Sequence, residues 1–158
     1  MLPFLIFSTL TAQAVDAGAA PGTATEVPLR SAFRLCDFSQ VAGTPLLPRL
    51  GFGSGVASIR PTGATVVAQV HFSNTSQPGG HYDVILIQLP RPSSSTCGPG
   101  DAGTDSSTLD LDAGGQGTLA LQGHLRSGAT GVWISVSQPN PRSQGPAEFY
   151  NSEFVVPA

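Results

Sequence analysis

The sequence predicts a single all-β domain, folded as one antiparallel β-sandwich of about seven to eight strands. The chain has 158 residues, a length typical of one domain. Its 19 glycines and 14 prolines make up about a fifth of the residues, against an average of roughly 12%. They recur between short apolar runs, a pattern typical of strands joined by turns. An interior proline destabilises a helix by about 3 kcal/mol, so this composition excludes a mainly helical fold.

The N-terminal region is predicted to lie outside this domain. A short apolar run, residues 2–10, precedes Ala12-Gln13-Ala14, whose small residues are typical of a signal peptidase site. We therefore expect a signal peptide over residues 1–14. No lysine or arginine precedes the apolar run, so the leader is either atypical or truncated. Residues 15–30 are small and polar and are predicted to form a flexible lead-in. The sandwich domain is then expected over residues 31–158.

Four strands are predicted in the first half of the domain. Residues 31–38 alternate, with Phe33 and Leu35 on one side. Residues 52–59 are rich in glycine but end in Val-Ala-Ser-Ile, and residues 64–72 and 82–89 have strong β-character. The run Val-Ile-Leu-Ile at 84–87 is apolar on both faces, which predicts a central strand covered on each side.

Four more strands are predicted in the second half. Over 108–112 leucines alternate with aspartates, and 117–125 has a similar strand pattern. Residues 131–137 place Val132, Ile134 and Val136 on one face and Trp133 on the other, and residues 153–156 form a short final strand. The resulting sandwich is immunoglobulin-like only in a loose architectural sense, because no motif identifies a family.

Two hairpins are expected between these strands. The first joins 64–73 to 81–90 and, if it is symmetric about Gln77, pairs an apolar inward face: Phe72 with Tyr82, Val70 with Val84, and Ala68 with Leu86. Its other face then places His71 opposite Asp83 and Ser73 opposite His81. The second joins 109–112 to 117–121 through Ala-Gly-Gly, whose glycines permit a tight turn.

The two cysteines, Cys36 and Cys97, are predicted to form a disulfide if the chain is exported. A bridge across this separation stabilises a fold by about 4 kcal/mol in the chain-entropy model. It would tether the long loop at 92–107. Two buried free thiols are the alternative, since the cysteines are too few for a zinc site and form no Cys-x-x-Cys motif.

The charged residues exclude a nucleic-acid-binding protein. The net charge is −3, and the seven cations are all arginines that are scattered along the chain. No basic stripe exists to neutralise a phosphate backbone.

The sharpest candidate site is a metal centre formed by His71, His81 and Asp83, which the first hairpin would bring together. The alternative is a surface histidine–aspartate contact. The aspartates of Asp110-x-Asp112-x-Gly114 resemble part of a calcium loop, but the remaining ligands are absent, so a hairpin turn is the simpler interpretation. The aromatic side chains of Tyr82, Trp133 and Tyr150 are candidates for stacking on a ligand. Trp133 is equally consistent with the core or with an exposed face.

The functional prediction is a non-catalytic, exported binding or cell-envelope interaction module. The chain has no Gly-x-Ser-x-Gly elbow and no cofactor-binding loop, so we expect neither an enzyme nor a cofactor. The predicted contact surfaces are the loops 74–80, 92–107 and 139–147, and the partner is an unknown protein, glycan or envelope ligand. No integral membrane segment is expected after cleavage. A metal-binding or redox protein, a small secreted hydrolase and a purely structural envelope protein are the alternatives.

Overall fold

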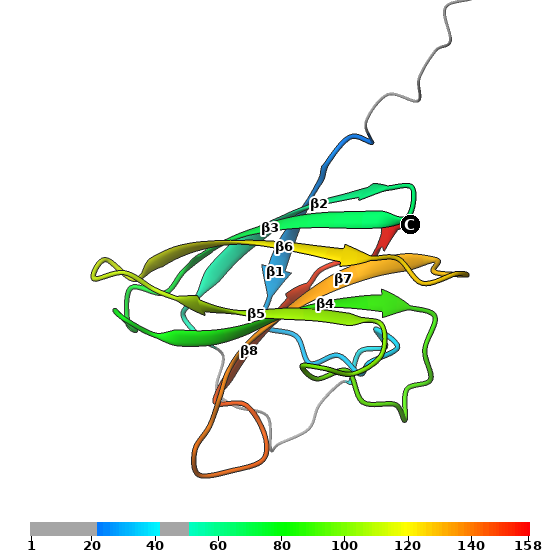
Figure 1. The fold of residues 1–158 in the computed structure, drawn as a ribbon. Coiled ribbons are helices and arrows are strands. Elements are labelled where there is room, and N and C mark those ends of the chain that lie inside the picture. The colour runs from blue at the N-terminus through cyan, green and yellow to red at the C-terminus, as the bar shows by residue number, and fades with distance from the viewer. Residues whose placement is uncertain (1–21, 42–50) are drawn as a thin grey trace, which may run out of the picture.

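The computed structural model describes residues 22–41 and 51–158, which form one curled antiparallel sheet (Figure 1). The predicted signal peptide and the first part of the lead-in lie outside these residues. Nine strands make up the sheet: β1 Thr25–Arg30, β2 Ser54–Thr62, β3 Thr65–Ser73, β4 His81–Leu89, β5 Thr104–Asp110, β6 Gln116–His124, β7 Gly131–Gln138, β8 Glu148–Ser152 and β9 Val156–Pro157. The described part of the chain has no helix that is long and apolar enough to cross a membrane.

The sheet is a nearly closed barrel. Its strand order is β5-β4-β7-β8-β1-β2-β3-β6, with β9 paired to β7. The two end strands, β5 and β6, return beside each other without a ladder between them in the described residues (Figure 1). The predicted all-β antiparallel fold is confirmed. The predicted sandwich differs, because a sandwich has two separate sheets, whereas here β1 pairs with both β2 and β8 and makes the sheet continuous.

The predicted hairpin between 64–73 and 81–90 is wrong. Strand β3 pairs with β2 and β6, while β4 pairs with β5 and β7. The loop between β3 and β4 therefore lies over one end of the barrel, where it contacts the turn between β5 and β6, instead of closing a ladder. The inward face is nevertheless as expected, and its six members are all buried: Ala68, Val70, Phe72, Tyr82, Val84 and Leu86. Alternation along a strand shows which face is apolar but does not select the neighbouring strand.

Three predicted boundaries also change. Residues 25–30 form β1 rather than a flexible lead-in, because Val27 and Leu29 alternate into the core. Residues 31–38 form no strand and contribute only an isolated bridge between Arg34 and Gln40. The last predicted strand, 153–156, does not form as such: β8 ends just before it, and β9 begins at its last residue, Val156. Strand β8 was missed because a proline-rich loop precedes it and hides its short pattern.

A second, smaller apolar cluster covers the outer face of β4 and β7. Ile85, Ile87 and Trp133 form this cluster, and Phe38 packs on it from the segment 31–41. The Phe38 ring meets the Trp133 ring edge-on, with centroids 5.4 Å apart. This packing confirms the prediction that the 84–87 run is a central strand buried on both faces. The strand predicted over residues 31–38 does not form, and the apolar residues of the segment 31–41 instead cover this part of the sheet; we call this segment the cover.

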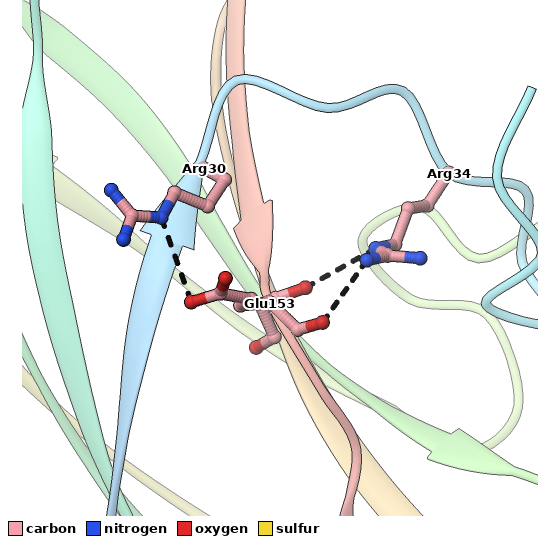
Figure 2. Close-up of polar contacts among 4 residues, drawn as sticks. Arg30, Arg34 and Glu153 are labelled. Carbon is pink, nitrogen blue, oxygen red and sulfur yellow. Dashed lines mark hydrogen bonds and ion pairs between the residues drawn. The ribbon is translucent and has the colours of Figure 1, made fainter. Parts of the chain in front are cut away.

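Arg34 holds this cover against the barrel. Its guanidinium donates to the carbonyl oxygens of Ser152 and Glu153 at 3.2 and 3.1 Å and lies 3.8 Å from the Phe38 ring centroid. Figure 2 shows Arg34 and Arg30 approaching Glu153 from opposite sides; Arg30 Nε is 3.6 Å from the Glu153 carboxylate. Burial lowers the pKa of Arg34, and the charge of Glu153 opposes this shift. These contacts hold the segment 31–41 in place, although its only β-pairing among the described residues is the isolated bridge between Arg34 and Gln40.

The predicted disulfide is confirmed between Cys36 and Cys97, whose Cα atoms are 5.7 Å apart. Cys36 lies in the cover segment and Cys97 in the loop between β4 and β5. In Figure 1 these two segments lie together beneath β4. The bond therefore joins two irregular segments outside the sheet and holds both near the outer cluster around Trp133.

Strands β5 and β6 are joined by a tight turn but then separate. The Asp112 carboxylate accepts from the amides of Gly114 and Gln116 at 2.8 and 2.9 Å, which stabilises the turn. The expected second hairpin is thus present as a turn without a ladder. Further along, Asp105 and Gly123 come so close that a Cβ on Gly123 would lie 2.0 Å from the Asp105 carboxylate. The Asp105 side chain therefore occupies the seam between the two strands at this position.

Candidate functional site

The three proposed metal ligands are not brought together. His71 lies on β3, where its Nδ1 is 3.0 Å from Thr118 Oγ1 of β6. His81 lies on β4, where its Nδ1 is 2.6 Å from Asp110 Oδ1 of β5. The two strands do not pair, so the hairpin that would have assembled the site does not form. Across the described residues, no group of three or more His, Cys, Asp or Glu side chains is placed to hold one metal ion.

The pair of His81 and Asp110 is an exposed cross-strand contact. The hydrogen bond to Asp110 raises the pKa of His81. The negative charges of Asp110 and Asp83 also raise this pKa, while burial lowers it. Both side chains are more than half exposed, so the pair is a surface histidine–aspartate contact, formed with Asp110 and not with the Asp83 of the predicted cluster. Asp112 is already occupied by its turn, and the calcium-like spacing is explained by that turn.

The three aromatic residues proposed to stack on a ligand are all buried. Tyr82, Trp133 and Tyr150 have exposed fractions of 0%, 2% and 1%. The Phe72 ring meets Tyr82 and Tyr150 at centroid distances of 4.9 and 4.8 Å inside the barrel, and Phe38 covers Trp133. Their faces pack on protein, so they do not form a stacking surface in this structure. Trp133 is on the outer side of β7 but belongs to the smaller cluster.

Both tyrosine hydroxyls converge on Glu148 at one end of the barrel. Tyr82 and Tyr150 donate to Glu148 Oε2 at 3.2 and 2.9 Å, and Asn74 Nδ2 donates to it at 3.1 Å. Burial raises the pKa of Tyr82 to about 12, with Asn74 opposing and Glu148 adding to the shift. Burial also raises the pKa of Tyr150, and Glu148 contributes in the same direction. One carboxylate oxygen thus satisfies three buried donors, a structural role that anchors the loop beginning at Asn74.

The sequence Asn74-Thr75-Ser76 has the form of a glycosylation site, but Asn74 is fully buried. Its Oδ1 accepts from Ser76 Oγ at 2.7 Å, and its Nδ2 donates to Tyr82 Oη at 3.0 Å. The nitrogen that a glycan would modify is therefore engaged inside the fold.

A hollow lined by charged side chains lies on the disulfide-anchored loop between β4 and β5. We call it the loop pocket, and its volume is about 320 Å³. This volume is at the lower end of the range for ligand sites. Its lining contains two arginines from distant parts of the chain, one aspartate, two hydroxyl side chains and small apolar residues: Pro90, Arg91, Pro92, Ser95, Thr96, Asp101, Ala102 and Arg126.

Buried Gln88 sets the position of Arg126. The Gln88 Nε2 donates to the His124 carbonyl at 2.8 Å, and its Oε1 accepts from the Arg126 amide at 2.8 Å. The Arg126 guanidinium then reaches back to the carbonyls of Gln88 and Pro90 at 3.3 and 3.2 Å. The Arg126 guanidinium also lies against Gly103: a Cβ atom added to Gly103 would be 2.6 Å from the Cζ of Arg126. The absence of a side chain at this position, which also has a positive φ of 72°, lets the arginine cross the loop.

Arg91 forms the other charged wall. It donates to the carbonyl oxygens of Thr96, at 3.2 Å, and of Ala102, which ties the two sides of the loop together. Its Nε is buried without a hydrogen-bond partner in the described structure. Burial lowers the pKa of Arg91, and the nearby charge of Arg126 lowers it further, while Asp101 opposes the shift. The two guanidinium groups therefore repel each other across the pocket.

Neither pocket arginine forms an ion pair within residues 22–41 and 51–158, where the ion pairs involve Arg30 and His81. Asp101 is the acidic residue of the lining, and its Oδ2 accepts from the Gly98 amide at 2.7 Å within its own loop. The pocket therefore has two positive charges and one negative charge. An arrangement of this kind favours binding an anion.

Among the described residues, two other hollows are lined by no arginine, lysine, aspartate or glutamate side chain. One, of about 300 Å³, lies over β2, β3 and β6 and is lined by Val56, His71 and Thr118 among mainly small residues. The other, of about 320 Å³, lies in the loop 139–147. Neither lining contains a charged pair, and no disulfide holds either one.

Arg91 and Arg126 are not among the functional candidates that the sequence predicts. The loop 92–107 is a predicted contact surface, but both arginines lie outside that range and are 35 positions apart. No local spacing signals their approach, because it depends on Gln88 bridging β4 to the end of β6. Comparison of the chain with protein-family models, with curated proteins and with solved structures found no match.

Proposed function

We propose that this chain is a non-catalytic binding module that acts outside the cytoplasm, in the cell envelope or secreted, and that it binds a ligand in the loop pocket. The observation that carries the proposal is the preorganisation of the pocket. Long irregular loops are uncommon unless they function or move. This loop is held by the Cys36–Cys97 bond and by arginine-to-carbonyl hydrogen bonds, while its hollow stays open.

Preorganisation favours binding because an ordered loop loses little entropy when a ligand arrives. The barrel provides a rigid support, with β4 buried on both faces directly before the loop. The disulfide supports an exported location, since such bonds persist in oxidising compartments. The buried positions of Tyr82, Trp133 and Tyr150 direct the proposal to polar recognition by the loop rather than to aromatic stacking.

The test compares wild-type protein with Ala102→Trp, which fills the pocket from an exposed position in its wall. Ala113→Trp is the matched control, since Ala113 is exposed in the turn between β5 and β6. Saturation-transfer NMR would be recorded with neutral sugars, acidic sugars and short peptides. We expect at least one compound to give a signal that disappears in Ala102→Trp and remains in Ala113→Trp. Signals that survive equally in both variants, or a panel without any signal, would overturn the proposal.

A further inference from the structure

The charges of the loop pocket indicate which ligands it selects. Arg91 and Arg126 line the same hollow, the charge of Arg126 lowers the pKa of Arg91, and neither arginine has a carboxylate partner within ion-pair distance in the described residues. Like charges held together in a partly buried wall are stabilised when an anion binds between them. The protein satisfies some of their donors with carbonyl oxygens, which are neutral and leave the positive charge uncompensated.

Free donors remain on the pocket wall. The hydrogen bonds of Arg126 to the carbonyls of Gln88 and Pro90 both use Nη2. Its Nε and Nη1 donate to no acceptor in the part of the chain that the structure describes. A guanidinium has five N–H donors in a planar fork that matches a carboxylate. Since Arg126 is exposed, an entering oxyanion can reach these donors.

The pocket also limits the charge of its ligand. Asp101 lines the same hollow, so the two arginines leave a net charge of one positive unit. A singly charged group balances this charge. A more highly charged group, such as phosphate at neutral pH, meets repulsion from the Asp101 carboxylate.

From this geometry we infer that the loop pocket binds a carboxylate group of a small polar ligand, held by Arg126 and Arg91 and opposed by Asp101. The inference rests on the proposed function and specifies the ligand chemistry of the same site. The carboxylate belongs either to an acidic sugar or to the C-terminal end of a short peptide, and both sources present the same planar, singly charged group.

Isothermal titration calorimetry with matched probes tests this inference. D-glucuronate and N-acetyl-alanine carry the carboxylate, while D-glucose and N-acetyl-alanine amide are their neutral counterparts. We expect at least one acid to bind about tenfold more tightly than its neutral counterpart, as a charge-assisted hydrogen bond provides. Comparing the two acids distinguishes a sugar source from a peptide source. Inorganic phosphate should bind more weakly than the better acid, and added NaCl should weaken all anion binding.

Three variants of the pocket charges sharpen the test. Arg126→Gln should weaken carboxylate binding about tenfold, and Asp101→Asn should strengthen it about threefold, because an opposing charge is removed. Arg126→Lys keeps the charge and should bind at an intermediate level, which separates electrostatics from loss of fold. Arg142→Gln makes the same charge change in the exposed loop 139–147 and should bind like wild type.

The outcomes separate this inference from the proposed function. One outcome overturns the carboxylate inference alone. In it, acids and their neutral counterparts bind equally, Ala102→Trp blocks this binding, and Arg126→Gln and Asp101→Asn leave it unchanged. The pocket then binds ligands, but not through a carboxylate. If Ala102→Trp changes no binding at all, the proposed function itself fails, and this inference fails with it.

Discussion

Phe72 and Tyr82 pack edge to face, with ring centroids 4.9 Å apart, although their strands share no ladder. Phe72 lies on a rung between Gly55 of β2 and Gly117 of β6. A Cβ on Gly55 would lie 2.9 Å from the Phe72 ring, so the ring needs the glycine beside it. The contact between Phe72 and Tyr82 links the two sides of the barrel interior and explains how consecutive strands can be unpaired yet packed together.

Removing the Phe72 ring should therefore destabilise the fold strongly. Phe72→Ala should lower the free energy of unfolding by about 3–5 kcal/mol, because it opens a cavity next to two tyrosines. Val56→Ala, at a position that is 37% exposed on β2, is the control and should change it by less than about 0.5 kcal/mol. Urea unfolding followed by Trp133 fluorescence measures both. Equal losses in the two variants would show that Phe72 does not occupy the centre of the core.

The two tyrosines of the chain should ionise at a higher pH than exposed tyrosines do. Folding raises the pKa of Tyr82 to about 12 and also raises that of Tyr150, against roughly 10 in an unfolded chain. The neutral form is thus favoured by the fold. This contribution to stability is fully present below pH about 10 and is lost as the pH rises toward 12.

Phenolate absorbance during a pH titration measures this effect, since the chain has only these two tyrosines. We expect little phenolate in the folded protein at pH about 10, the pKa of an exposed tyrosine. In Glu148→Gln the absorbance should rise at lower pH, because the charge that helps to raise both pKa values is gone. Half of the signal appearing with an ordinary pKa would contradict the burial of one tyrosine.

The Cys36–Cys97 bond should control the exposure of Trp133. Breaking it should lower stability by about 4 kcal/mol in the chain-entropy model. It should also release the Phe38 cover, because Cys36 holds that segment to the loop. Trp133 is the only tryptophan, so its emission should shift to longer wavelength when the protein is reduced. A Cys36→Ser/Cys97→Ser double variant is the control and should not respond to reductant. Unchanged emission on reduction of wild type would mean that other contacts hold the cover.

Asn74 should be a structural residue rather than a glycosylation site. Asn74→Ala removes a donor shared by Tyr82 and Glu148 inside the barrel end and should lower the unfolding free energy by about 1–3 kcal/mol. Asn140→Ala, in the loop 139–147, removes only exposed hydrogen bonds and should have a smaller effect. Thermal unfolding of both variants provides the comparison, and equal stability would argue against the buried network.

Local patterns predicted the inward faces of the strands but not their neighbours. The alternation that marks Val70 and Phe72 as inward holds for either pairing of β3, so the sequence could not distinguish a hairpin from a crossing loop. Strand β1 escaped notice because Val27 and Leu29 are separated by a proline, which weakens a strand signal. The two cysteines were paired correctly because the chain has no others.

The candidate site could be predicted from the sequence less well than the fold. The aromatic residues were proposed as a binding surface from residue type alone, and residue type does not distinguish a buried ring such as Tyr82 from an exposed one. The pocket needs Arg126 to cross Gly103 and Gln88 to bridge β4 to the end of β6. These are contacts between distant segments, and no short motif encodes them.

The most direct test of the loop pocket is an amide NMR titration of the oxidised protein with D-glucuronate and N-acetyl-alanine. We predict that the amide shifts concentrate at residues 91–102 and at Arg126, and that they fade in Ala102→Trp. Shifts centred instead on the hollow around His71 or on the loop 139–147, or no shifts with either acid, would contradict binding in the loop pocket.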